Sequence, residues 1–132
     1  MDLEQKRQLN ARVCEALGYE IISGEVDNVN PLYNNGHRLK EMDFSGSWAW
    51  MGVMVEKAFE KEIYISVEPF RSFTLDYKNS NSYYTNEYRV QARNERSVVL
   101  SSLEDENPTF AACIVFLDAQ GMDITQYLGE VI

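Results

Sequence analysis

Few residues in this sequence carry side chains that commonly act as nucleophiles, general bases or metal ligands. There is one histidine, His37, and there are two cysteines, Cys14 and Cys113. His37 lies in a polar stretch, whereas both cysteines lie in apolar, helix-like patterns. A metal site normally needs two or more His or Cys residues at close spacing. We therefore expect no metal, no cofactor and no catalytic activity. The alternative is a His–Cys catalytic pair, which buried and therefore inert thiols would not form.

A second polar group surrounds the start of an expected helix. Ser45-Gly46-Ser47 lies there, and backbone N–H groups at a helix start can hold an anion. Ordinary helix capping is the simpler interpretation, because the spacing fits neither a phosphate-binding loop nor a Gly-x-Ser-x-Gly turn. The candidate loop and helix N-terminus comprise Tyr33, Asn34, Asn35, Asp43, Ser45 and Ser47.

Aromatic and basic residues gather in the second half of the chain. Tyr83, Tyr84 and Tyr88 lie in and beside an Asn- and Ser-rich stretch, a composition typical of adaptable recognition loops. Arg89 and Arg93 follow on an expected strand and should point to the same side. These five residues predict a pocket for an anionic small molecule, such as a nucleotide, held by stacking and bidentate contacts. The alternative is a strand with solvent-facing arginines and tyrosines packed at the sheet edge.

Acidic residues are concentrated toward the end of the chain. The sequence has 21 Asp+Glu and 12 Lys+Arg, a formal net charge of −9, and no Lys or Arg follows Arg96. This balance argues against binding nucleic acid directly and against docking on an anionic membrane. We predict an acidic face that steers the chain toward a host protein with a basic surface, with a solubilising surface as the alternative. The predicted face comprises Glu104, Asp105, Glu106, Asp118 and Asp123.

The elements that position these residues begin with two predicted helices. Residues 2–17 have helical apolar spacing and end before Gly18, a typical stop residue. Residues 19–42 predict a long loop, and such loops tend to be functional or mobile. A second helix is expected over residues 43–61, with Asp43 as its N-cap. Its apolar stripe consists of Trp48, Met51, Val55 and Phe59 and is widened by Val53, Met54 and Ala58.

The second half predicts an antiparallel sheet. Alternation with a period of two predicts strands over residues 63–67 and 73–77, joined by a turn at 69–72 into a hairpin. A polar loop, functional or mobile, is expected at 79–86. The third strand is expected over residues 88–93.

A fourth strand and a last helix complete the predicted fold. The strand is expected near residues 97–101. Asn107-Pro108 predicts the start of a buried helix, because Asn is a favoured N-cap and Pro a favoured first residue. Gly121 ends that helix, and residues 122–132 form a tail with a short helix or a docked segment.

These elements predict a single α+β domain over residues 1–132. A small antiparallel sheet of three to four strands carries packed helices as an α-β-α sandwich, in the order α-α-β-β-β-(β)-α. The charged N-terminus has no apolar stretch typical of a signal peptide, and no apolar run approaches the ~20 residues of a membrane span. We expect a cytoplasmic chain with reduced cysteines. An open strand edge favours a homodimer or higher oligomer.

The order of segments resembles the phage "ABA sandwich" family, small proteins of phages and prophages. The similar segments are residues 11–18, ending in Leu-Gly; 30–35, with a Pro-x-Tyr turn; 43–57, with Trp48 or Trp50; and 108–114, with Ala-Ala-Cys. Residues 36–42 separate the turn from the helix here, whereas in the family the turn runs almost directly into it. The resemblance implies a phage origin and a bacterial host cell, and it implies no catalytic residues.

Two functions of different classes fit these observations. The first is a non-catalytic phage accessory protein that binds and blocks a host factor, such as an anti-defence inhibitor, through its acidic face. The second is a binder that sequesters a nucleotide-type signal at the Tyr/Arg pocket. A structural phage protein is the remaining alternative.

Overall fold

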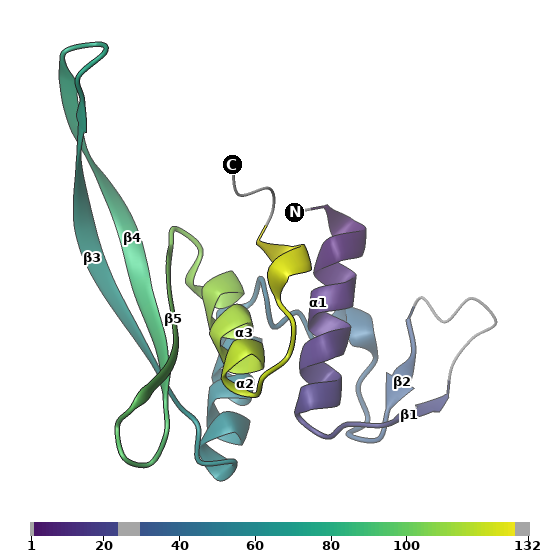
Figure 1. The fold of residues 1–132 in the computed structure, drawn as a ribbon. Helices are drawn as coiled ribbons and strands as arrows, with labels where there is room; N and C mark the ends of the chain where they lie inside the picture. Colours follow the sequence, from purple (N-terminus) through teal and green to yellow (C-terminus); the bar gives the residue numbers. More distant parts are fainter. Residues whose placement is uncertain (1, 24–29, 129–132) are drawn as a thin grey trace.

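The protein was analysed as a computed structural model, which describes residues 2–23 and 30–128 (Figure 1). The predicted α+β class and the order of the main helices and strands are confirmed. In chain order the elements are α1 (Leu3–Ala16), β1 (Ile21–Ser23), β2 (Leu32–Tyr33), η1 (Leu39–Glu41), α2 (Trp48–Glu60), β3 (Tyr64–Asp76), β4 (Asn81–Arg93), β5 (Val99–Asp105), α3 (Pro108–Ala119) and η2 (Thr125–Tyr127).

The main sheet is antiparallel in the order β3-β4-β5. β3 pairs with β4 over its full length, from Tyr64–Arg93 to Asp76–Asn81. β5 pairs only with the part of β4 from Tyr88 to Arg93. The far halves of β3 and β4 therefore project beyond the third strand as a twisted two-stranded ribbon (Figure 1). We call residues 71–86 the arm.

The core lies around α3. This helix packs against β4 and β5 on one side and against α1 on the other, with α2 beside it (Figure 1). Every residue from Ala111 to Leu117 is buried, which explains why the segment is apolar on all sides. Among the described residues, α2 and α3 cover one face of the sheet, here called the inner face, which carries Val90 and Ala92 of β4.

Local capping rules place the ends of α1 and α3 correctly. Asp2 caps α1 through a reciprocal hydrogen-bond pair with Gln5. Gly18 follows α1 with φ of 87°, a conformation that favours glycine. The expected start of α3 is confirmed, because the Asn107 side chain accepts a hydrogen bond from the Phe110 N–H and Pro108 is the first helical residue.

The predicted start of α2 is wrong, and the predicted apolar stripe is buried only in part. The helix begins at Trp48, and its N-cap is Ser47. The Asp43 carboxylate instead accepts a hydrogen bond from Asn10 and pairs with Lys6. The buried residues of α2 are Met51, Met54 and Ala58. Trp48 is 56% exposed and Phe59 is 63% exposed, so both ends of the predicted stripe lie at the surface.

The predicted hairpin within residues 63–77 is also wrong, because β3 runs straight through Pro69. Proline is tolerated on an edge strand, where its missing N–H faces solvent. The turn falls at residues 77–80, where Ser80 has a φ of 50°. Most of the expected polar loop at 79–86 is therefore strand, paired with β3. The fourth strand is β5, which begins at Val99 and includes Glu104 and Asp105.

The expected loop over 19–42 contains the small β1–β2 pair and η1, and its residues 24–29 lie outside the described part. The tail forms the short helix η2, whose Tyr127 is buried against the core. Residues 129–132 of that tail lie outside the described part. Within the described ranges no helix is long and apolar enough to cross a membrane.

Candidate functional site

The predicted Tyr/Arg pocket is divided between the two faces of the sheet. Residues at even positions of β4, including Tyr84 and Tyr88, share the inner face with Val90, whereas Tyr83, Arg89 and Arg93 point to the other, outer face. Tyr83 and Arg89 share that face, but six residues of strand separate them by about 20 Å. The structure therefore does not bring the five residues together.

Both arginines of this set already have partners on the outer face. Arg89 donates two hydrogen bonds to one oxygen of Glu104, at 3.0 and 3.1 Å, and stacks over Phe70. Arg93 donates to the Ser97 carbonyl and to the Gln91 side chain. These contacts match the alternative interpretation of a strand with arginines on its solvent face.

The predicted acidic residues occupy separate places. Asp105 and Glu106 precede α3, whereas Asp118 and Asp123 lie at its far end, about 18 Å away for a 12-residue helix. Glu104 lies on the outer face with Arg89. Several of these carboxylates also serve the fold. Asp118 accepts a hydrogen bond from the Ser101 hydroxyl, and hydrogen bonds from Thr125 lower the pKa of Asp123.

Two members of the predicted loop and helix N-terminus, Asp43 and Ser45, belong to a polar network that joins α1 to α3. Asn10 of α1 donates to the Asp43 carboxylate at 3.1 Å and accepts from the Ser45 N–H at 3.0 Å. The Thr109 hydroxyl of α3 donates to the Ser45 carbonyl at 2.7 Å. Lys6 pairs with the other Asp43 oxygen at 3.2 Å. Asn10, Ser45 and Thr109 are buried, so the network fixes the packing of three segments.

The other members of that set also have structural partners. Tyr33 is buried, and burial raises the pKa of its hydroxyl to about 12. Asn34 accepts a hydrogen bond from the Glu20 N–H, and Asn35 accepts one from the His37 N–H. Ser47 caps α2. The set is thus divided between the β1–β2 region and the helix-capping network.

The cysteines and the histidine are not arranged for nucleophilic chemistry. Both thiols are buried, and burial raises the pKa of Cys14 to about 12 and raises that of Cys113 as well. His37 lies 3.1 Å from a Glu41 oxygen and packs edge-on against Trp50. Among the described residues no group of three His, Cys, Asp or Glu side chains is placed to hold a metal.

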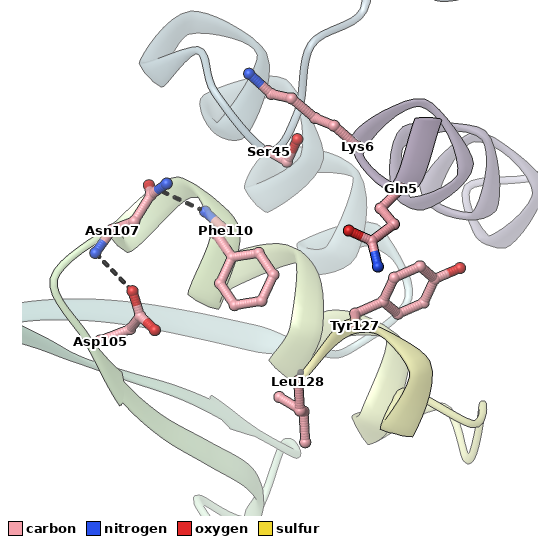
Figure 2. A pocket seen from close by; sticks show the side chains of 8 residues that line it. All are labelled: Gln5, Lys6, Ser45, Asp105, Asn107, Phe110, Tyr127 and Leu128. Carbon is pink, nitrogen blue, oxygen red and sulfur yellow. Dashed lines mark hydrogen bonds between the residues drawn. The ribbon is translucent and has the colours of Figure 1, made fainter. Parts of the chain in front are cut away.

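A hollow of about 460 Å³ lies where α1, the start of α3 and η2 meet (Figure 2). The Phe110 and Tyr127 rings form part of its wall. Many of its polar groups are already used. Asn107 caps α3 and donates its backbone N–H to Asp105, while Lys6 pairs with Asp43. This hollow is therefore built from the capping groups that hold the helices together.

The arm carries an exposed apolar set, of which only Tyr84 belongs to the predicted pocket. On the inner face of its two strands, Phe73 is 51%, Leu75 50% and Tyr84 63% exposed. The Phe73 and Tyr84 rings lie 5.1 Å apart, and the Arg71 guanidinium lies over the Tyr84 ring. The same face is covered by helices nearer the body, so these side chains continue the core beyond the point where the helix layer ends (Figure 1).

A second exposed apolar surface lies beside the open edge of β3. A hollow of about 520 Å³ there is lined by Val55, Glu56, Phe59, Glu60, Ile63, Tyr64 and Ile65. We call it the α2–β3 groove. Phe59 packs edge-on against Tyr64 at 5.2 Å and remains largely exposed. Its lining combines apolar side chains with two carboxylates and has no basic residue.

Comparison of the chain with models of known protein families, with curated proteins and with solved structures finds no match. The similarity to the phage sandwich family therefore stays a prediction from the sequence.

Proposed function

We propose that this protein is a non-catalytic protein-binding module that docks through the inner face of its arm. The observation that carries this proposal is the exposure of Phe73, Leu75 and Tyr84 on a ribbon that leaves the body of the molecule (Figure 1). Exposed apolar patches of this kind mark interaction sites, and aromatic residues are enriched where binding energy is concentrated. The arm supplies such a surface without contributing to the core around α3.

The chemistry of the arm favours a protein surface over a small anion. Arg71 is its one basic residue on the inner face, and that guanidinium already stacks on Tyr84. An apolar ribbon about two strands wide suits a groove or a strand edge of another protein. Sequestration of a nucleotide-type signal receives less support, because its five predicted residues are divided between two faces of the sheet.

We keep two parts of the sequence interpretation as proposals. One is the origin of the chain in a phage or prophage. The other is that docking blocks a host factor with a basic surface, which the net charge of −9 supports by long-range attraction. The predicted acidic residues lie at both ends of α3 and on the outer face of the sheet, so this attraction would act through the whole body and not through one acidic patch.

Photo-crosslinking from the arm tests the proposed docking surface. A benzophenone amino acid at position 84 of the full chain should give saturable crosslinks to protein in a bacterial lysate. The same group at position 3, an exposed site on α1, is the matched control and should give none. Excess unlabelled wild-type chain should suppress the crosslinks, whereas Leu75→Glu should not. Equal labelling from both positions, or labelling that does not saturate, would contradict the proposal.

A further inference from the structure

We infer that the partner of the arm is a second copy of this chain. In this arrangement, the β3 strands of two copies pair antiparallel about a twofold axis at Phe70. The arm of each copy then covers the α2–β3 groove of the other. This inference rests on the docking surface of the proposed function and assigns that surface to a second copy of the chain in place of a host factor.

The open edge of β3 provides the first observation. In the described part of the chain β3 pairs with β4 alone, and this leaves one edge of a 13-residue strand without a hydrogen-bonding neighbour. Such edges are templates for pairing with another chain. Antiparallel pairing of identical edges forms a closed twofold interface, the commonest kind in soluble oligomers. Pro69 lowers the number of hydrogen bonds by one in each strand but leaves the other amides available.

The pattern of side chains selects the register. A twofold axis perpendicular to the sheet keeps both inner faces on the same side, so odd residues of β3 pair with odd residues. Centring the axis on Phe70 places apolar side chains opposite one another, Leu75 beside Ile65 and Phe73 beside Val67 of the second copy. Moving the register by two residues in one direction places Arg71 opposite Val67, and in the other direction places Arg71 opposite the second Arg71. The centred register is the one that avoids both conflicts.

This register joins the two exposed apolar surfaces of the molecule. Ile65 lines the α2–β3 groove, so Leu75 of the other copy lies next to that groove, on the side where α2 packs. Phe59 and Val55 form the neighbouring wall. Each arm, which lacks a helix layer of its own, thereby gains contact with α2 of the second copy, and each Phe59 loses contact with water. Burial of both patches is the main favourable contribution.

The charges of the two surfaces are complementary. Residues 71–86 contain Arg71, Lys78 and Asp76, a net charge of +1, in a chain whose total is −9. The groove that receives them has Glu56 and Glu60 in its lining. The part of each chain that reaches the second body thus carries a small positive charge, and this reduces the repulsion between two acidic bodies.

Oligomeric state and two disruptive variants test the interface. Sedimentation equilibrium of the full chain should show a dimer. Leu75→Glu and Phe59→Glu should each give a monomer with an unchanged far-UV circular dichroism spectrum, because both side chains are exposed in the isolated chain. Thr74→Glu is the matched control, since it places the same charge on the neighbouring outer-face position, and it should remain dimeric.

Disulfide trapping tests the register. In this register Phe70 lies opposite Phe70 of the second copy. Directly opposed strand residues fall within the Cα distance of a disulfide, so Phe70→Cys should give a covalent dimer on mild oxidation. Ser72→Cys, two residues along the same face, lies opposite Glu68 and should give none. The two native thiols are buried and add no background.

The outcomes separate this inference from the proposed function. A wild-type chain that stays monomeric, or a dimer that survives both Glu variants and does not crosslink through position 70, overturns the inference. If the chain is monomeric but the arm still crosslinks saturably to another protein, the docking function stands and the second copy is excluded. If neither kind of association occurs, both proposals fail.

Discussion

Asn10 is the residue on which the contact between α1 and the turn before α2 depends most directly. Its amide satisfies the buried Ser45 N–H and one Asp43 oxygen at the same time. Asn10→Ala would leave that N–H without a partner in a site closed to water. We expect a loss of about 2 kcal/mol in the free energy of unfolding, measured by urea titration. Gln8→Ala, on the exposed face of the same helix, should change it by less than about 0.5 kcal/mol.

The two buried thiols and the buried Tyr33 hydroxyl should make the folded protein less stable at alkaline pH. Burial raises the pKa of Cys14 from its ordinary 9.0 to about 12, and that of Tyr33 from 10.0 to about 12. Above pH 9 the unfolded chain therefore releases protons that the folded chain retains. The contribution of these three groups to the free energy of unfolding should be constant well below pH 9, and the free energy of unfolding should fall as the pH rises from 9 toward 12.

The Cys14→Ala variant provides the control for this alkaline slope. Urea titrations at intervals of pH should show a shallower fall for the variant than for wild type. If the free energy of unfolding falls equally steeply with pH in both chains, the Cys14 thiol does not contribute to the loss of stability.

At the scale of elements, two glycines near the start of α2 should respond to alanine in opposite directions. A Cβ at Gly46 would lie 2.5 Å from both Asp43 Oδ2 and Lys6 Nζ, so Gly46→Ala must separate that ion pair. A Cβ at Gly52 meets nothing within 4 Å. We expect Gly46→Ala to cost about 1 kcal/mol and Gly52→Ala to gain about 0.5 to 1 kcal/mol, because alanine favours a helix interior.

Thermal unfolding of the two variants measures this difference. A lower Tm for Gly46→Ala together with a higher Tm for Gly52→Ala is the expected result. The same sign for both substitutions would contradict the assigned start of α2, because it would give the two glycines equivalent surroundings.

Elements governed by local chemistry were predictable from the sequence, and those governed by pairing were not. The cap at Asn107 identifies the start of α3 because the signal lies within three residues of the cap. The single strand β3 was misread because Pro69-Phe70-Arg71-Ser72 resembles a turn. Apolar residues occupy odd positions in both runs, from Ile63 to Val67 and from Phe73 to Tyr77, and this shared phase is the signal of one continuous strand.

The candidate sites were harder to predict because they depend on faces and not on composition. Tyr84 and Arg89 are close in sequence, yet strand alternation places them on opposite sides of the sheet. Trp48 and Phe59 fit the same helical stripe as Met51, yet Met51 is buried and the other two side chains are exposed. Which side of an amphipathic element is covered follows from tertiary packing, which a period in the sequence does not encode.

At the scale of the whole molecule, the net charge of −9 makes the ionic strength a test of which partner the arm meets. Two copies of an acidic chain repel at long range, and salt screens that repulsion. The dissociation constant of the dimer should therefore fall several-fold between about 20 mM and about 300 mM NaCl, measured by sedimentation equilibrium.

Docking on a basic host protein would have the opposite salt dependence, because screening removes an attraction. The wild-type chain at pH 7 and at pH 5, closer to its pI of about 4.5, provides a second comparison. Dimerisation should strengthen at the lower pH. If association through the arm weakens both at the higher salt concentration and at pH 5, a basic partner is favoured over a second copy.

In β3 and β4, the residues covered by helices are constrained by folding, whereas the residues of the projecting arm are constrained by what the arm binds. Substitutions at Val67 or Val90 act on the packing of the sheet against the helices, so folding limits what those positions tolerate. Substitutions in residues 71–86 leave that packing unchanged and act only on what the arm contacts. A descendant of this chain can therefore acquire a different binding partner through changes in sixteen consecutive residues while its folding information stays intact, which makes the arm the natural place to begin redesigning specificity.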